Sequence, residues 1–162
     1  MSPPKDPFRP ADDEARALAR RLLDEARFGA LGVLLDDAPF VTRVALVPGP
    51  DGVPVTLVSD LAPHTAALRT APLCSILVGQ PGPKGDPLTH PRLTLQARAA
   101  FVPDRGGEWQ QLRGRYLDCL PKARLYIDFA DFHLVRLVPL SGHLNGGFGK
   151  AYRLGAADLR RP

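Results

Sequence analysis

The sequence predicts a single domain of the α+β class in which β-strands dominate. A chain of 162 residues fits one domain of common size. Its 18 prolines and 15 glycines indicate many tight turns, as expected of short-stranded β architecture. Residues 92–102 alternate apolar and polar side chains in the manner of a half-buried strand. We expect residues 1–10 to form a flexible arm and residues 11–162 to form the domain.

An amphipathic helix is predicted immediately after the arm. Apolar residues recur at helical spacing over residues 15–26, and Asp12, Asp13 and Glu14 precede them. Acidic side chains in the first turn interact favourably with the helix dipole. This helix should pack one apolar stripe against the rest of the domain.

Strands follow the helix. Residues 28–35 and 39–47 are apolar runs joined by a short acidic turn, which predicts a β-hairpin. Residues 53–59 add a third strand, so we expect a three-stranded meander. Residues 73–78 form the next strand, and the segment 79–91 is too rich in proline and glycine for a regular element.

The second half predicts helices and one buried strand. Residues 108–120 show helical spacing, and a second short helical stretch begins at Pro121 and runs through Phe129. Residues 132–140 are apolar on both faces, as expected of a strand buried from two sides. Within this strand His133 is interpreted as a hydrogen-bonded core histidine. The glycines of residues 143–150 permit a tight turn.

Composition and motifs exclude several function classes. The formal net charge of +4 comes from scattered basic residues, which indicates a solvated basic surface rather than nucleic-acid binding. No apolar run approaches the length of a membrane span or a signal core, so we expect a cytoplasmic protein. Cys74 and Cys119 lack metal-site spacing and are interpreted as buried thiols. No nucleophile elbow or metal-binding histidine pair is present, and no catalytic residue is assigned.

The strand-turn-helix of residues 53–72 carries the main candidate site. The strand breaks at Ser59, and Pro63 suits the first turn of a helix, which leaves free backbone N–H groups beside His64 and Thr65. Such a turn can bind a phosphate or can be an ordinary polar turn with a helix cap. Arg43 interrupts an apolar strand, where it either faces solvent or reaches a ligand.

The element order and these motifs resemble the FMN-binding split barrel of the pyridoxamine 5′-phosphate oxidase-like superfamily. The resemblance implies a six- to seven-stranded antiparallel barrel with flanking helices, and a homodimer that binds its cofactor at the subunit interface. It places Ser59, His64 and Thr65 at the FMN phosphate and Arg43 at a flavin-contacting strand position. It also places Arg92 where a polar residue of the partner subunit reaches the cofactor.

Three segments resemble the haem-utilisation branch of this superfamily more closely. They are Ala-Arg-Phe-Gly at residues 26–29, Ser-Asp-Leu-x-x-His-Thr at residues 59–65, and Gly-Gly-Phe-Gly at residues 146–149. If the chain binds haem as some of these relatives do, the resemblance makes His143 the candidate axial ligand. Pyridoxamine phosphate oxidases carry an Arg-Lys pair where this chain has His64 and Thr65, so that activity is not predicted.

Three functions therefore stand as hypotheses. The first is a dimeric FMN-binding flavoprotein that acts as an oxidoreductase on an unknown substrate, with the cofactor supplying the redox chemistry. The second is a haem-binding or haem-degrading protein that uses the same dimer cleft. The third is a split-barrel binding module without a cofactor.

Overall fold

The computed structural model describes residues 1–103 and 105–162. The helices are α1 (Asp13–Glu25), α2 (Pro63–Thr70) and α3 (Gly107–Cys119), with short 3₁₀ turns η1 (Pro87–Thr89), η2 (Pro121–Leu125) and η3 (Ala156–Leu159). The strands are β1 (Arg9–Pro10), β2 (Phe28–Leu35), β3 (Ala38–Ala45), β4 (Val47–Pro48), β5 (Pro54–Ser59), β6 (Leu73–Val78), β7 (Arg92–Phe101), β8 (Phe132–Asn145) and β9 (Ala151–Gly155). All of these strands belong to one sheet.

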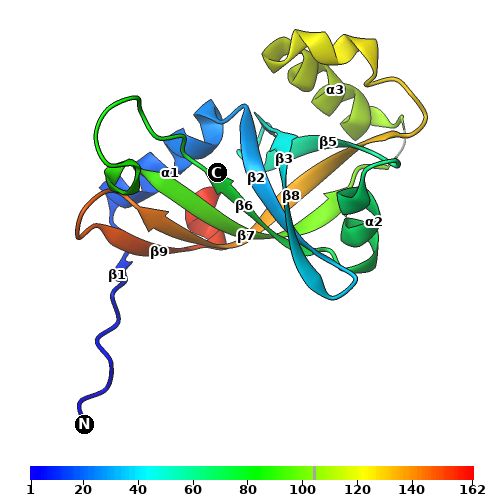
Figure 1. Cartoon of the computed structure of the whole chain (residues 1–162). Helices are drawn as coiled ribbons and strands as arrows, with labels where there is room; N and C mark the ends of the chain where they lie inside the picture. Colours follow the sequence, from blue (N-terminus) through cyan, green and yellow to red (C-terminus); the bar gives the residue numbers. More distant parts are fainter. Residues whose placement is uncertain (104) are drawn as a thin grey trace.

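The sheet curls into a split barrel, which confirms the predicted fold. Neighbouring strands run in the order β3-β2-β6-β7-β8, and β8 also pairs with β5. Strand β3 pairs with β2. The chain then continues into the two-residue strand β4, which pairs with β5 and closes the barrel. The barrel pairings are antiparallel, and the parallel pair β1–β9 lies outside the barrel. Figure 1 shows α1 at one end of the curled sheet, α2 at the other and α3 projecting above it.

Strand β8 is the longest element of the barrel and connects its two halves. Its first residues, Phe132 to Arg136, pair with β5, and its last residues, Ser141 to Asn145, pair with β9. Its opposite edge pairs with β7 along nearly the whole length, interrupted by a bulge beside Gln96 and Ala97. The start of β8 therefore lies beside the β5–α2 turn, and its end lies between β7 and β9.

Local sequence explains where the N-terminal elements begin and turn. The Asp12 carboxylate accepts a hydrogen bond of 2.7 Å from the Ala15 N–H and caps α1. Asp36 and Asp37 both adopt positive φ, so the hairpin between β2 and β3 closes through a tight two-residue turn. Short polar side chains tolerate this left-handed conformation better than most residues.

Two apolar clusters hold the elements together. The larger one fills the barrel and includes Ala15, Ala19 and Leu23 of α1. The smaller one joins α3 and η2 to the outside of β5 and β8, around the buried Trp109 and Tyr116. Burial of aromatic and aliphatic area is the main favourable contribution to folding. The barrel and the α3 layer are thus two cores that share β5 and β8.

Four expectations need correction. The strand at residues 53–59 does not complete a meander, because β5 meets its predecessor only at β4 and otherwise pairs with β8. The buried strand predicted to end at residue 140 continues to Asn145, which places His143 on β8. The second helical stretch is a 3₁₀ turn that ends at Leu125, and β9 was not predicted. These features depend on pairing partners far away in sequence.

The described part of the chain contains no helix with the length and hydropathy needed to cross a lipid bilayer. Cys74 is buried and Cys119 half-buried, and both are free thiols. Burial raises the pKa of Cys74 to about 11, so this thiol is protonated at neutral pH.

Candidate functional site

The predicted phosphate element lies at the β5–α2 turn, where its hydroxyl groups bond within the chain. Thr65 is only 1 % exposed, and its hydroxyl donates a 2.5 Å hydrogen bond to the Ser59 carbonyl oxygen. The Ser59 hydroxyl accepts from the Leu61 N–H at 3.2 Å and donates to an Asp131 carboxylate oxygen at 3.3 Å. A hydroxyl has one proton to donate, so both donors are already used. These groups stabilise the turn.

Asp60 continues this internal network. Its Oδ1 lies 2.9 Å from His133 Nε2 and 3.7 Å from an Arg69 guanidinium nitrogen. The neighbouring His133 imidazole, together with the nearby Arg69 charge, lowers the pKa of the Asp60 carboxyl. The Arg69 guanidinium also sits over the Phe101 ring, 4.1 Å from its centroid. His133 is therefore a half-buried histidine whose Nε2 lies beside a carboxylate at the barrel end but meets no partner with hydrogen-bond geometry, so its interpretation as a hydrogen-bonded core histidine stays a prediction.

His64 differs from its neighbours in the same turn. It is half-buried at the start of α2, and burial lowers the pKa of its imidazole, which is therefore neutral at physiological pH. The helix cap Ala62 provides no side-chain hydrogen bond, and Pro63 occupies the first turn. Pro63 has no N–H, and the Thr65 N–H bonds to the Ala62 carbonyl at 3.0 Å, so the backbone N–H and the neutral imidazole of His64 are the groups of this turn that could bind a ligand.

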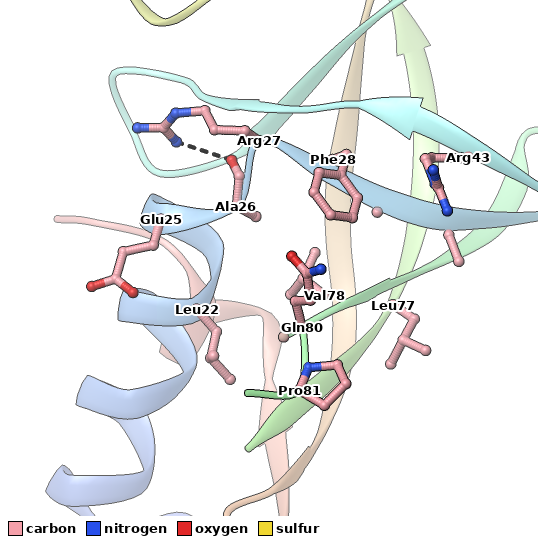
Figure 2. A pocket seen from close by; sticks show the side chains of 13 residues that line it. Leu22, Glu25, Ala26, Arg27, Phe28, Arg43, Leu77, Val78, Gln80 and Pro81 are labelled. Carbon is pink, nitrogen blue, oxygen red and sulfur yellow. Dashed lines mark hydrogen bonds between the residues drawn. The ribbon is translucent and has the colours of Figure 1, made fainter. Parts of the chain in front are cut away.

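Arg43 lies elsewhere, in a cleft of about 670 Å³. The cleft is bounded by the end of α1, the first residues of β2, the end of β6 and the start of the following loop. Figure 2 shows Phe28 and Arg43 on one side, Gln80 and Pro81 below them, and Leu22 on the helix side. The Arg43 guanidinium stands 5.6 Å from the Phe28 ring centroid and forms no ion pair with any described residue.

Arg92 and His143 occupy a third place, on the outer face of β7 and β8. Arg92 donates a 2.8 Å hydrogen bond to the Leu88 carbonyl, and His143 pairs in register with Thr94. The His143 ring lies 5.2 Å from the Phe8 ring, so residues from the N-terminal arm contact it. Within the described residues, no three histidine, cysteine or acidic side chains gather as a metal site.

The structure thus separates the predicted residues into three places. Ser59, His64 and Thr65 come together, Arg43 lies in the cleft, and Arg92 lies with His143 on the outer sheet face. Their roles as ligands stay predictions. The residue that sequence reasoning missed is Phe28, which is 44 % exposed at the start of β2. All residues of β2 are apolar or glycine, so the sequence does not show which face is exposed, and only the burial along the folded strand places Phe28 on the outer face. The Ala-Arg-Phe-Gly segment of residues 26–29 is the sequence signal that includes it.

The outer face of the sheet is also unusually apolar. Besides Phe28, five large side chains on β2, β3, β6 and β8 are each more than two-fifths exposed: Leu34, Val41, Leu73, Leu77 and Leu140. A shallow groove of about 440 Å³ runs between most of them. Contiguous apolar surface of this kind marks interaction sites on soluble proteins. We call these five residues the outer apolar patch. Leu77 also lines the cleft, so patch and cleft are continuous.

Comparison with known proteins finds similar chains, two of which have names that refer to heme. No family model matches it. A segment of 113 residues, 68 % of the chain, is 34 % identical to the chloroplastic non-canonical heme oxygenase HOZ of Arabidopsis thaliana, and the chain spans 32 % of that protein. A solved heme binding protein from Mycobacterium smegmatis is 29 % identical, with a TM-score of 0.82 over 94 % of this chain and 61 % of that one. Protein Atu2129 of Agrobacterium tumefaciens, of unknown function, is 34 % identical, with a TM-score of 0.81 over 99 % of this chain and 66 % of that one.

Proposed function

Because the chain belongs to the pyridoxamine 5′-phosphate oxidase-like split-barrel superfamily, close to its haem-utilisation branch, we propose that it is a homodimeric haem-binding protein. The similarity to HOZ and to the mycobacterial heme binding protein supports haem over other cofactors. The observation that carries the proposal is the cleft around Arg43, whose lining combines apolar walls with Glu25, Arg27 and Arg43. The Arg27 guanidinium donates to the Asp24 and Ala26 carbonyls, whereas the Arg43 guanidinium forms no ion pair with a described residue and stands over the Phe28 ring.

The cleft residues fit a flat apolar ring with carboxylate arms. Phe28, Leu22 and Leu77 provide apolar contact, and the outward-facing Phe28 ring can stack against a planar ligand. Arg43 would bind a propionate through charge-assisted hydrogen bonds, which are about twice as strong as neutral ones. Pockets for organic ligands are typically mostly apolar with a few placed polar groups, and this cleft has that composition.

Axial ligation must come from outside the cleft lining, because none of its residues is a histidine. His143 lies on the same outer sheet face as Arg43, and His64 has the neutral imidazole that coordinates metals. Haem itself would supply redox-active iron, tuned by its axial ligand and by the polarity around it. Haem degradation is the activity that a relative's name suggests.

A second copy of the chain would complete the site. The outer apolar patch and the cleft are parts of one sheet face, so a two-fold contact through this face would bury both. Val41 is 67 % exposed and Leu73 is 52 % exposed, values that a stable isolated surface seldom combines in one groove. The cofactor would then lie at the subunit interface.

FMN is the second candidate, and with it an FMN-dependent oxidoreductase. The start of α2 favours it, since the backbone N–H and the imidazole of His64 can bind a phosphate there. The hydroxyl protons of Ser59 and Thr65 already bond within the turn, so they add little to this phosphate site. The neutral His64 adds less charge than a basic pair would.

An absorbance titration of the purified protein with hemin and, separately, with FMN tests the proposal. We expect a Soret band that saturates at one hemin per protomer and is retained through gel filtration. Elution at twice the 17.5 kDa chain mass is expected, and Val41→Asp combined with Leu73→Asp should give the monomer mass. Retained flavin absorbance without hemin uptake would replace haem by FMN. Uptake of neither ligand would leave the cofactor-free module.

A further inference from the structure

The loop between β6 and β7 forms one wall of the cleft. Its first residues, Gly79, Gln80 and Pro81, line the cleft opposite Phe28 (Figure 2). Gly79 has a φ of +100°, and a Cβ there would lie 2.5 Å from the Pro91 carbonyl oxygen, so the two ends of the loop touch. The loop composition, with prolines at 81, 83, 87 and 91, predicts no regular structure that would hold this wall.

A single imidazole organises the loop instead. His90 Nδ1 accepts a 2.9 Å hydrogen bond from the Gly82 N–H, and His90 Nε2 lies 2.8 Å from the Lys84 carbonyl oxygen. A carbonyl oxygen only accepts, so Nε2 carries the proton and Nδ1 presents its lone pair. Both ring nitrogens therefore bond to backbone groups in the first half of the loop, at Gly82 and Lys84, and the ring must be neutral to do so.

The other half of the loop is anchored to β7. The Asp86 carboxylate accepts from the Leu88 N–H at 2.9 Å and caps η1, and Arg92 of β7 donates to the Leu88 carbonyl at 2.8 Å. At Gly82 a Cβ would lie 3.0 Å from His90 Cε1, so only glycine approaches the ring this closely. His90 thus joins the half of the loop that lines the cleft to the half that is fixed.

We propose that His90 is a positioning residue for the ligand in the cleft, because its imidazole holds the loop wall of residues 79–81 in place. The proposal rests on the cleft being the cofactor site. The Gly82 N–H and the Lys84 carbonyl follow the cleft wall directly in the chain, so loss of the imidazole removes both bonds that fix this half of the loop. The Asp86 carboxylate and the Arg92 guanidinium bond within the other half.

Readouts without ligand test whether His90 holds the loop. We expect His90→Ala to speed trypsin cleavage after Lys84 and amide hydrogen exchange at Gly82 by about tenfold, while global unfolding is unchanged. His90→Gln should restore both, because its amide can accept and donate in the same places. Leu88→Ala is the matched control, since this side chain is 68 % exposed on the same loop.

Hemin titration then links the loop to the ligand. We expect His90→Ala to weaken hemin uptake about tenfold, with His90→Gln and Leu88→Ala close to wild type. Unchanged loop protection in His90→Ala, or a loosened loop with unchanged hemin affinity, would overturn the proposal. If wild-type protein takes up no hemin, the positioning role falls with the proposed function, a failure visible before any variant is measured.

Discussion

The β5–α2 turn and the cleft around Arg43 use polar side chains in opposite ways. In the turn, Thr65 bonds to Ser59 and Ser59 bonds to Asp131, so both hydroxyl groups have a partner within the chain. In the cleft, the Arg43 guanidinium stands over the Phe28 ring and forms no ion pair with a described residue. Polar groups that are satisfied internally stabilise a fold, whereas a cation left without an anion is available to a ligand.

A residue that matches a known motif is therefore not always a residue that is available to a ligand. The turn carries the more recognisable motif, yet burial and hydrogen bonding commit most of its groups to structure. The cleft carries one candidate residue of the sequence analysis, Arg43, together with the Ala-Arg-Phe-Gly segment of residues 26–29, and its Arg43 charge has no ion-pair partner among the described residues. Variants in the turn should therefore change stability, and variants in the cleft should change binding.

Replacement of Arg43 by alanine should have the largest effect on binding. Loss of a charge-assisted hydrogen bond to a propionate should lower hemin affinity by about ten- to a hundredfold. The free energy of unfolding should stay within about 0.5 kcal/mol, as for other surface substitutions. Hemin titration and urea unfolding measure the two effects, with Arg21→Ala on the exposed face of α1 as control. Equal hemin affinities for the two variants would refute the role of Arg43.

Thr65→Val should lower stability and leave hemin binding unchanged, the reverse of what is expected for Arg43→Ala. The variant removes one of the two hydrogen bonds that the Ser59 carbonyl accepts, since the Ala62 N–H also donates to it at 3.0 Å, so the free energy of unfolding should fall by about 0.5–1.5 kcal/mol. Thr65→Ser keeps a hydroxyl and should recover most of this loss. Hemin affinity of the folded Thr65→Val protein should match wild type. A large loss of affinity with unchanged stability would instead make Thr65 a ligand-binding residue.

Phe28→Leu should give a smaller effect on binding. Replacing an exposed ring by an aliphatic side chain removes stacking worth about 0.5–1.5 kcal/mol, so hemin affinity should fall about two- to tenfold. Phe28→Tyr keeps the ring and should bind as wild type. Stability should change little in either variant. If Phe28→Leu and Phe28→Tyr bind alike, ring stacking does not contribute.

Asp60→Asn should have the smallest effect and concerns only the turn. The folded-state pKa of Asp60 lies below its unfolded value, so this carboxylate contributes stability that is full above about pH 4. The contribution is lost as pH falls through the lower folded-state pKa. Unfolding midpoints of wild type should therefore drop more steeply below pH 4 than those of the variant. Parallel acid profiles would show that the pair with His133 adds nothing.

Elements with a strong local signal were predictable. The capping acid Asp12 and the apolar spacing after it gave the start of α1, and alternation or apolar runs gave the bounds of β2 and β6. Local periodicity and capping depend on residues within one or two turns, so the chain reveals them directly. The split-barrel fold followed from the order of these elements together with the motifs.

Pairing over long distances was not predictable from local patterns. Strand β5 pairs with β8 rather than joining a meander, and the end of β8 is a strand only because β7 and β9 lie on either side of it. The glycines at residues 146 and 147 suggested that the strand stops early. Hydrogen bonds from distant strands outweighed that local signal.

For the candidate site, the sequence by itself determined which chemical groups are present: the hydroxyls of the β5–α2 turn, an arginine on β3 and histidines on several elements. Only the tertiary structure decided which of them a ligand can use. Availability depends on partners brought from elsewhere, such as Asp131 for Ser59, and on walls assembled from α1, β2 and the loop after β6. A hydrogen bond made within the fold consumes a donor, and composition and spacing do not record which donors have been consumed.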